Sequence, residues 1–210
     1  MRPLGDPLAQ GLAVLGLEAH DAHMQRLLDY LQLLQRWNRV YNLTAITSSE
    51  DMIRLHLLDS LAVAPFLQGT THVDVGSGAG LPGIPLAIWL PDCRFTLLDS
   101  SGRKTRFLMQ AKIELGLTNV EVVEERVEHW RPPSAFDGVL SRAFSSLSDF
   151  VRLAGHLVQP EGALYALKGN WPEPAAGPLP SPFFLRACRA LQIPGISASR
   201  HLIEVGVVNP

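Results

Sequence analysis

A glycine-rich segment carries the clearest chemical signal in this sequence. It reads Val73-Asp74-Val75-Gly76-Ser77-Gly78-Ala79-Gly80-Leu81-Pro82-Gly83-Ile84-Pro85 and begins within an apolar run that predicts a short buried strand. Glycines allow a sharp turn and let a ligand approach the main chain, and the apolar segment that follows predicts a helix with free N–H groups at its start. We therefore expect this loop to bind a nucleotide-type ligand at the edge of a parallel sheet.

The spacing of the glycines distinguishes between possible ligands. A dinucleotide-binding loop needs a glycine where this chain has Leu81, and no Lys-Ser or Lys-Thr pair follows to form a phosphate-binding loop. Asp99 ends the next predicted strand, where a carboxylate suits the two hydroxyls of a ribose, and Asp74 suits a cationic amino group. S-adenosylmethionine, an adenosyl compound without phosphate, matches this pattern best.

Basic residues follow three of the predicted strands. They are Arg126, Arg142 and Lys168, and Lys168 is one of only three lysines in the chain. Ligands of open α/β sheets lie beyond the carboxyl ends of the strands, so these residues predict a cationic rim for an anionic substrate. A single arginine at such a position is equally well explained as a surface residue.

Further candidates lie beside the predicted strand ends. Val127 and Glu128 follow the third strand, where we expect them to contact an adenine, although Glu128 also suits a solvated helix start. Arg103, Lys104 and Arg106 open the helix after Asp99, a position where cations oppose the helix dipole and therefore indicate a functional role.

One histidine is a weaker candidate. His56 shares a predicted helix face with Ser60, but such a histidine more often packs or caps than catalyses. No nucleophile–histidine arrangement and no spacing typical of metal ligands can be assembled from the sequence. Methyl transfer needs neither, because its sulfonium donor is already activated and alignment supplies much of the acceleration.

Composition limits the class of protein. The chain has 210 residues, of which 47% are hydrophobic and 18% charged, as expected for a globular domain with a substantial core. No apolar run approaches the roughly 20 residues needed to cross a bilayer. A net charge of −2 argues against broad binding to a nucleic-acid backbone but allows a local basic cluster. Cys93 and Cys188 show no disulfide framework, which fits the cytoplasm.

The elements that must position these residues fall into two parts. Residues 6–67 are predicted helical, with apolar periodicity over 24–41 and a further helix over 51–66. Beyond residue 70 strands alternate with helices, which predicts an α/β, mostly parallel, Rossmann-like sheet that ends in an antiparallel hairpin over 183–191 and 201–208. The predicted strands are 72–75, 94–98, 120–123, 137–141 and 162–167, and the predicted helices are 83–90, 102–115 and 146–157. We expect residues 1–69 to form a helical extension packed on a domain of residues 70–210, with a Pro-rich loop at 171–182.

With these motifs assembled, the sequence closely resembles the bacterial small-subunit ribosomal RNA methyltransferase G family, also called glucose-inhibited division protein B. The signatures beyond the glycine loop are Trp37-Asn38, Tyr41-Asn42-Leu43-Thr44, His56-Leu57-Leu58-Asp59-Ser60, Leu98-Asp99-Ser100, Ser141-Arg142-Ala143-Phe144 and Ala166-Leu167-Lys168-Gly169. They span residues 37–169 in the family's order. The Pro-rich loop and the absence of a basic net charge depart from the family pattern.

The resemblance implies a class I, Rossmann-like fold and methyl transfer from S-adenosylmethionine to N7 of a specific guanosine of 16S rRNA, in the decoding region of the small ribosomal subunit. Guanine N7 carries no proton, so no general base is required. The expected partners are 16S rRNA, the small subunit or a precursor particle, with no membrane, no metal, and a monomeric enzyme in the cytoplasm. The expected catalytic residues are His56, Arg126, Arg142 and Lys168; the expected cofactor residues are Asp74, Gly76, Gly78, Gly80, Leu81, Asp99, Val127, Glu128 and Arg142; and the expected RNA contacts are Asn42, Arg103, Lys104 and Arg106.

Three alternative functions remain open from the residues alone. A small-molecule methyltransferase would share the fold, because fold does not determine substrate. A nicotinamide oxidoreductase is disfavoured by Leu81. A non-catalytic RNA-binding or assembly factor would be expected to lose the set formed by Asp74, Asp99 and the glycines, which is intact here.

Overall fold

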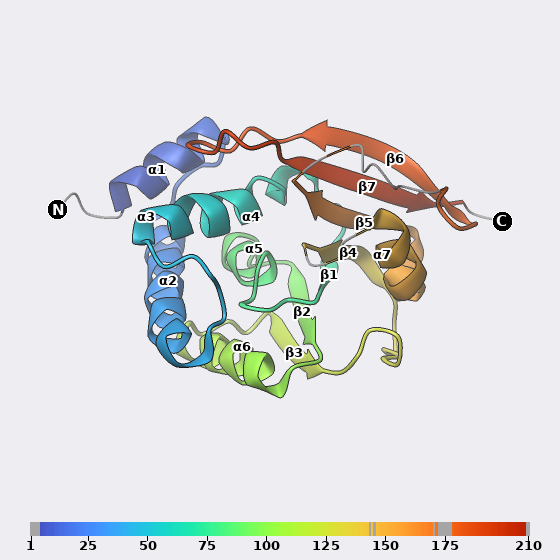
Figure 1. Cartoon of the computed structure of the whole chain (residues 1–210), viewed down its shortest axis with the longest axis horizontal. Helices are drawn as coiled ribbons and strands as arrows, with labels where there is room; N and C mark the ends of the chain where they lie inside the picture. The colour runs from blue at the N-terminus through green and yellow to red at the C-terminus, as the bar shows by residue number, and fades with distance from the viewer. Residues whose placement is uncertain (1–4, 143, 145, 170, 172–177, 209–210) are drawn as a thin grey trace.

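The sheet of this protein is mostly parallel. The computed structural model describes residues 5–142, 144, 146–169, 171 and 178–208, and these form a seven-stranded sheet with the order β3-β2-β1-β4-β5-β7-β6 (Figure 1). The strands are β1 (Thr71–Val75), β2 (Arg94–Asp99), β3 (Val120–Glu124), β4 (Phe136–Ser141), β5 (Val158–Lys168), β6 (Phe183–Ala190) and β7 (His201–Val207). Strands β1 to β5 are parallel, and β7 runs antiparallel to both β5 and β6. The predicted α/β fold with a terminal antiparallel hairpin is confirmed.

The helices lie on both faces of this sheet. They are α1 (Gly5–Val14), α2 (Asp21–Tyr41), α3 (Ser49–Met52), α4 (Asp59–Leu61), α5 (Gly83–Trp89), α6 (Gly102–Glu114) and α7 (Leu147–Ala154). A π-helical turn, Ile53–Leu58, joins α3 to α4, and short 3₁₀ turns occupy Ala64–Phe66 and Gly155–Leu157.

Several predicted boundaries differ from the structure. The helix expected over 51–66 is divided into α3, the π-helical turn, α4 and a 3₁₀ turn. Strand β5 begins four residues before the expected start at 162, because its first part pairs with Phe136 of β4 across an irregularity. In the Pro-rich segment, residues 172–177 lie outside the described residues, and 178–182 contain no helix.

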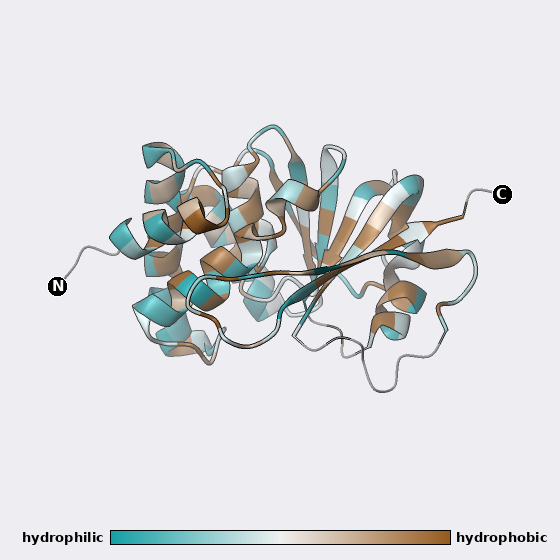
Figure 2. Cartoon of the chain, turned by 90° about the horizontal axis from the view of Figure 1, so that it is seen from above, coloured by the Kyte–Doolittle hydropathy of each residue, from teal (hydrophilic) through white to brown (hydrophobic). Residues whose placement is uncertain are grey.

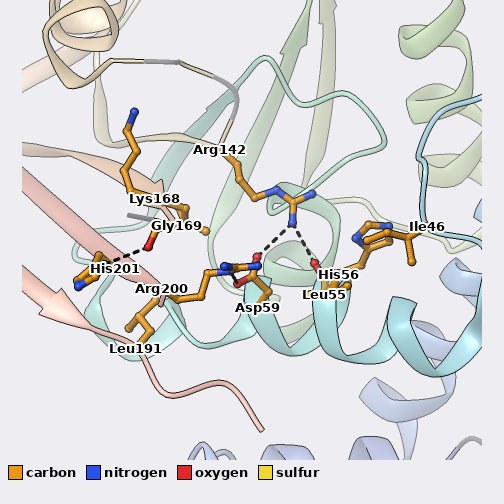
Figure 3. Close-up of a pocket in the computed structure, with 11 residues that line it drawn as sticks. Ile46, Leu55, His56, Asp59, Arg142, Lys168, Gly169, Leu191, Arg200 and His201 are labelled. Carbon is orange, nitrogen blue, oxygen red and sulfur yellow. Dashed lines mark hydrogen bonds and ion pairs between the residues drawn. The ribbon is translucent and has the colours of Figure 1, made fainter. Parts of the chain in front are cut away.

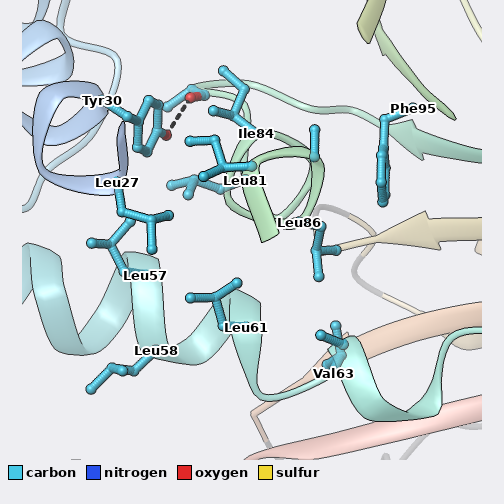
Figure 4. Close-up of a cluster of buried hydrophobic side chains, with 14 of the residues drawn as sticks. Leu27, Tyr30, Leu57, Leu58, Leu61, Val63, Leu81, Ile84, Leu86 and Phe95 are labelled. Carbon is cyan, nitrogen blue, oxygen red and sulfur yellow. Dashed lines mark hydrogen bonds between the residues drawn. The ribbon is translucent and has the colours of Figure 1, made fainter. Parts of the chain in front are cut away.

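One apolar cluster joins the N-terminal helices to the sheet. Leu27 and Leu57 belong to the same buried cluster as Ile84 of α5 and Phe95 of β2, and Figure 4 shows Leu57 and Leu61 on the side of their helix that faces α5. Burial of such side chains contributes roughly 1.5–3 kcal/mol each, so the helices are held firmly on this face.

A second cluster covers the opposite face of the sheet. Phe150 and Val151 of α7 pack with Val73, Val139 and Ile203 of the strands. Figure 2 shows apolar residues along the strands between the two layers of helices, with hydrophilic residues on outward turns. In the described part of the chain no helix combines the length and apolar character needed to span a membrane.

Candidate active site

The glycine loop turns sharply at the carboxyl end of β1. Gly76, Gly78 and Gly80 have φ values of +73°, +61° and +85°, a region that side chains with a Cβ rarely adopt. At Gly80 a Cβ would also collide with the side chain of Ile84, so this glycine permits the loop to pack on α5. Gly80 therefore shapes the loop from its core side, and its contact with the cofactor stays a prediction.

Asp99 fixes the outer side of the loop. Its Oδ2 accepts the Gly78 N–H at 2.9 Å, and its Oδ1 accepts the Ser101 N–H at 2.9 Å. Lys104 Nζ lies 3.4 Å from Oδ2, so Lys104 extends toward this carboxylate, and its contact with RNA stays a prediction. Asp99 is thus held at the end of β2, in the wall of a cavity beside the loop.

Asp74 supports the loop from beneath. It is fully buried, and its Oδ2 accepts hydrogen bonds from Ser77 Oγ at 2.6 Å and from the Gly83 N–H at 3.0 Å. Burial raises the pKa of Asp74 to about 6, against the opposing effect of the Ser77 and Gly83 hydrogen bonds. Asp74 does not line the cavity, but its buried Oδ1 has no hydrogen-bond partner among the described residues, so its contact with a cofactor amino group stays a prediction.

The cavity beside the loop, hereafter the cofactor pocket, has a volume of about 240 Å³. Its walls include Val75, Gly76, Leu98, Asp99, Ser100, Lys104, Glu125, Arg126, Val127, Glu128 and Phe144. The structure therefore brings together Gly76, Asp99, Val127 and Glu128 as expected for cofactor residues. Leu81 is 4% exposed within the apolar core and is not among the residues that line this cavity, so its contact with the cofactor stays a prediction.

Arg126 also lies at the cofactor pocket. Its Nε is 3.3 Å from Glu128 Oε1, and its side chain is 65% exposed. We predicted Arg126 among the catalytic residues with His56 and Lys168, but those residues line a different cavity. The reason is topological, because β3 lies at one end of the sheet, whereas β4 and β5 lie on the other side of β1.

A second cavity, hereafter the acceptor pocket, has a volume of about 410 Å³ and lies over the ends of β4 and β5 (Figure 3). It is lined by Ile46, Leu55, His56, Asp59, Arg142, Leu167, Lys168, Gly169, Leu191, Arg200 and His201. The helical extension, two parallel strands and the β6–β7 connection all contribute to it.

Arg142 is held by the helical extension. Its Nη1 donates to the Leu55 carbonyl at 3.3 Å and to Asp59 Oδ2 at 3.3 Å. In the π-helical turn the Asp59 N–H bonds to the Arg54 carbonyl, five residues back, so Leu55 loses the donor that an α-helix would supply and Arg142 bonds to it instead. Arg142 lines the acceptor pocket, and its positive charge also acts on the Asp74 carboxyl beneath the glycine loop, so its assignment to the cofactor stays a prediction.

His56 is neutral in this site. It is 3% exposed, and its Nε2 lies 3.0 Å from Thr44 Oγ1. Burial, reinforced by the nearby charge of Arg142, lowers the pKa of His56 to about 4. At neutral pH this side chain therefore serves as a hydrogen-bonding group, and its pKa is far from that of an efficient general base.

Lys168 lies between the two pockets. It lines the acceptor pocket, and its Nζ donates to the Phe144 carbonyl at 2.9 Å, while Phe144 lines the cofactor pocket. Figure 3 shows the Lys168 side chain directed away from Asp59. The Lys168–Phe144 hydrogen bond therefore lies at the boundary between the two pockets.

The remaining predicted RNA residues are on the surface. Asn42 caps α2 in a left-handed conformation with φ 49°, and it is exposed. Arg103 and Arg106 are exposed on α6. None of these three lines either pocket.

Three residues that sequence reasoning missed contribute to the site. The hydroxyl of Tyr30, a buried residue of helix α2, donates to the Ala79 carbonyl of the glycine loop at 2.7 Å. Asp59 and Arg200 meet in the acceptor pocket, where Arg200 Nε lies 3.1 Å from Asp59 Oδ1. The motif around His56 contained Asp59, but no sequence signal linked it to an arginine 141 residues away.

The strand order, the glycine loop and the acidic end of β2 define a class I, Rossmann-like S-adenosylmethionine-dependent methyltransferase. The chain is similar in fold to an S-adenosylmethionine-dependent methyltransferase from Aquifex aeolicus, with a TM-score of 0.55 and 16% identity over 83% of this chain and 98% of that one. It is also similar in fold to TrmN from Thermus thermophilus, with a TM-score of 0.54 and 22% identity over 71% of this chain and 47% of that one.

Sequence comparison identifies the family. The model of rRNA small subunit methyltransferase G matches residues 23–203. Curated proteins of that name are 52% identical in Nitrosococcus oceani, over 94% of this chain and 92% of that protein, and 50% identical in Stutzerimonas stutzeri, over 94% and 93%. The chain belongs to the rRNA small subunit methyltransferase G family, and it is an S-adenosylmethionine-dependent rRNA methyltransferase.

Proposed function

We propose that this enzyme transfers a methyl group from S-adenosylmethionine to N7 of one guanosine in the decoding region of 16S rRNA. The observation that carries the proposal is the acceptor pocket beside the cofactor pocket, in which neither Asp59 nor His56 is suited to act as a general base. Asp59 bonds to two arginines, and His56 is neutral with a pKa of about 4. Such a pocket suits an acceptor atom that carries no proton, and guanine N7 is one.

The cofactor pocket fits S-adenosylmethionine. The main chain at Gly76 allows close approach, Asp99 offers carboxylate oxygens at the wall, and the loop of Val127 and Glu128 closes the other side. The bound cofactor supplies a methyl group on a positively charged sulfur that is already activated toward nucleophiles. We propose Gly76, Gly78, Asp99, Val127 and Glu128 as the residues that bind or shape its site.

Residues of the acceptor pocket would orient the guanine and its backbone. Arg142 and Lys168 supply positive charge beside the boundary of the two pockets, and His56 supplies a neutral hydrogen-bonding ring. Since no proton is removed before transfer, alignment of N7 with the methyl group is the main contribution of the protein. Arg126, at the rim of the cofactor pocket, would contact the RNA and not the reacting base.

The wider RNA surface would include the exposed Arg103 and Arg106 of α6 and the cap residue Asn42. A net charge of −2 supplies little general attraction for RNA. We therefore propose that the substrate is the small subunit or a precursor particle, in which folded RNA presents the target.

The organisation of the chain agrees with a compact enzyme. We propose that residues 1–69 are an extension of the catalytic domain, because Tyr30 and Leu57 share the core of the sheet. We also propose a monomer that works in the cytoplasm, where its substrate is assembled. Sedimentation of the purified protein would reveal a larger assembly.

The direct test incubates the purified protein with methyl-labelled S-adenosylmethionine and unmethylated small subunits, followed by mapping of the modified nucleotide. We expect label at one guanine N7 in the decoding region and much less label on free 16S rRNA. Label on another atom or another region would reject the proposal, as would cofactor binding without any RNA methylation.

A further inference from the structure

We propose that Asp59 positions Arg142 and Arg200 as a paired cation, and that this pair binds one phosphate of the RNA strand whose guanine enters the acceptor pocket. The inference rests on the function proposed above. It adds a positioning residue and a phosphate-binding site to the acceptor pocket.

The geometry around Asp59 is two-sided. Oδ2 lies 3.3 Å from Arg142 Nη1, and Oδ1 lies 3.1 Å from Arg200 Nε. Figure 3 shows the two guanidinium groups reaching the carboxylate from different elements, Arg142 from the end of β4 and Arg200 from the segment before β7. Because each oxygen binds one guanidinium, a single 8%-exposed carboxylate fixes both side chains.

The local fold makes this arrangement possible. The π-helical turn presents the Leu55 carbonyl and the Asp59 carboxylate to the same atom, Arg142 Nη1. The guanidinium is therefore held at two points of the helical extension, which restricts its rotation. A π-helical turn within an α-helical segment is frequently found at functional sites.

The charge balance favours an anion. Two guanidinium groups and one carboxylate leave a net positive charge, and Lys168 also lines this pocket. The side chains of Arg142 and Arg200 remain 28% and 25% exposed, so a ligand can reach them. Without Asp59 the two cations would repel each other and separate into solvent.

Donors remain for the ligand. A guanidinium carries five N–H groups. In the described part of the chain the hydrogen bonds of Arg142 use Nη1, and those of Arg200 use Nε and Nη1. Nε and Nη2 of Arg142 and Nη2 of Arg200 can therefore donate to phosphate oxygens, the geometry for which arginine is especially suited. A guanine that leaves its stack brings its flanking phosphates with it, so such a ligand is always present.

The test replaces Asp59 with asparagine, which keeps the size of the side chain and removes its charge. With unmethylated small subunits we expect kcat/KM to fall by about 100-fold, as for other misplaced substrate-binding groups, while the Kd for S-adenosylmethionine stays within about twofold. The negative slope of log kcat/KM against log salt concentration should become less steep by about one, since one phosphate contact is lost. Arg200→Gln should change the slope by the same amount, and Asp59→Glu should recover part of the activity.

Asp51→Asn is the matched control, because it removes the same charge from an exposed pair with Arg54 on the adjoining helical turn. Normal activity of Asp59→Asn would overturn the proposal. Reduced activity with an unchanged salt slope would overturn the phosphate assignment. If Asp59→Asn loses more cofactor affinity or more stability than Asp51→Asn, Asp59 has a purely structural role and the proposal is overturned. The wild-type enzyme is assayed in parallel. If the wild type itself fails to methylate guanine N7, the proposed function is rejected. If the wild type and Asp59→Asn are equally active, only the role of Asp59 is rejected.

Discussion

The two pockets of this enzyme are built in opposite ways. Apart from Phe144, the cofactor pocket comes from residues 75–128, at the ends of three neighbouring strands, and the main chain of its glycine loop forms one wall. The acceptor pocket comes from residues 46–59, Arg142, 167–169 and 191–201, and side chains form most of its functional surface. One pocket thus depends on local backbone shape, and the other depends on contacts between distant elements.

This difference determines how each pocket should respond to substitution. Changes in the glycine loop should affect cofactor affinity, because the loop conformation is the binding surface. Changes in the acceptor pocket should affect RNA methylation and leave cofactor affinity nearly intact. The following experiments test that separation, from the largest expected effect to the smallest.

Gly78→Asp should abolish measurable binding of S-adenosylmethionine. The substitution adds a carboxylate to a loop whose Gly78 N–H already binds Asp99, and it places a side chain at φ +61°. The backbone strain alone costs roughly 1–2 kcal/mol of stability. Calorimetric titration with S-adenosylmethionine measures the affinity.

Gly116→Asp is the control for that strain, since Gly116 has φ +62° with open space around it and lies outside both pockets. It should lose similar stability and bind the cofactor normally. Equal cofactor affinity of Gly78→Asp and Gly116→Asp would show that the cofactor site is misplaced.

Arg142→Ala should lower kcat/KM for small subunits by about 100-fold, the usual effect of removing one preorganised electrostatic donor. Cofactor affinity should change little, because Arg142 bonds to Asp59 and Leu55 in the other pocket. Single-turnover methylation assays together with cofactor titration measure the two effects. Arg152→Ala, which breaks an exposed pair on α7, should leave both unchanged. A large loss of cofactor affinity in Arg142→Ala would mean that the two pockets are not separate.

Tyr30→Phe should weaken cofactor binding by about fivefold to tenfold, which corresponds to the roughly 1 kcal/mol of one buried hydrogen bond. The lost bond joins α2 to the Ala79 carbonyl of the glycine loop. Titration with S-adenosylmethionine measures the change. Tyr165→Phe removes a buried hydroxyl that accepts from the Gln68 N–H, away from the loop, and should leave affinity unchanged. If both variants bind the cofactor like the wild type, α2 does not stabilise the loop.

The methylation rate should show no step due to His56 between about pH 6 and pH 8. The lowered pKa of about 4 keeps the ring neutral throughout this range in the folded enzyme. The unfolded chain gains a proton on this residue below about 6.5, so the free energy of unfolding should fall as the pH drops from 6.5 toward 4.

A pH–rate profile under saturating substrate measures the first effect, and denaturant unfolding at several pH values measures the second. In His56→Gln the free energy of unfolding should fall less steeply as the pH drops from 6.5 toward 4. A wild-type rate that rises with an apparent pKa near 6.5, and no such rise in His56→Gln, would make His56 a general base and contradict our assignment.

Comparison of predicted and observed elements shows where the sequence is informative. The strand β1, the loop and helix α5 follow from a local pattern, because positive φ values and a helix start leave direct marks in glycine and proline spacing. The helix predicted over 51–66 instead contains a π-helical turn. In this turn the Leu55 carbonyl bonds to Arg142, a partner far along the chain that the local sequence pattern does not reveal.

Individual site residues follow the same division. Asp99 lines the pocket beside the glycine loop, as its position at a strand end predicts. Leu81 and Asp74 are buried and do not line the cofactor pocket, and their spacing alone does not tell whether a side chain in a loop faces a ligand or the core. Arg126 was grouped with Lys168 because the sequence reveals that both follow strands but not that β2, β1 and β4 lie between those strands.

The sequence by itself determined the α/β fold, the cofactor loop and the family, because each of these depends on short-range spacing or on motifs in order along the chain. The tertiary structure alone decided that Arg142 and Arg200 share Asp59 and that Tyr30 supports the glycine loop. The physical reason is that these contacts join segments between 49 and 141 residues apart, whose meeting is set by packing of the helical extension on the sheet.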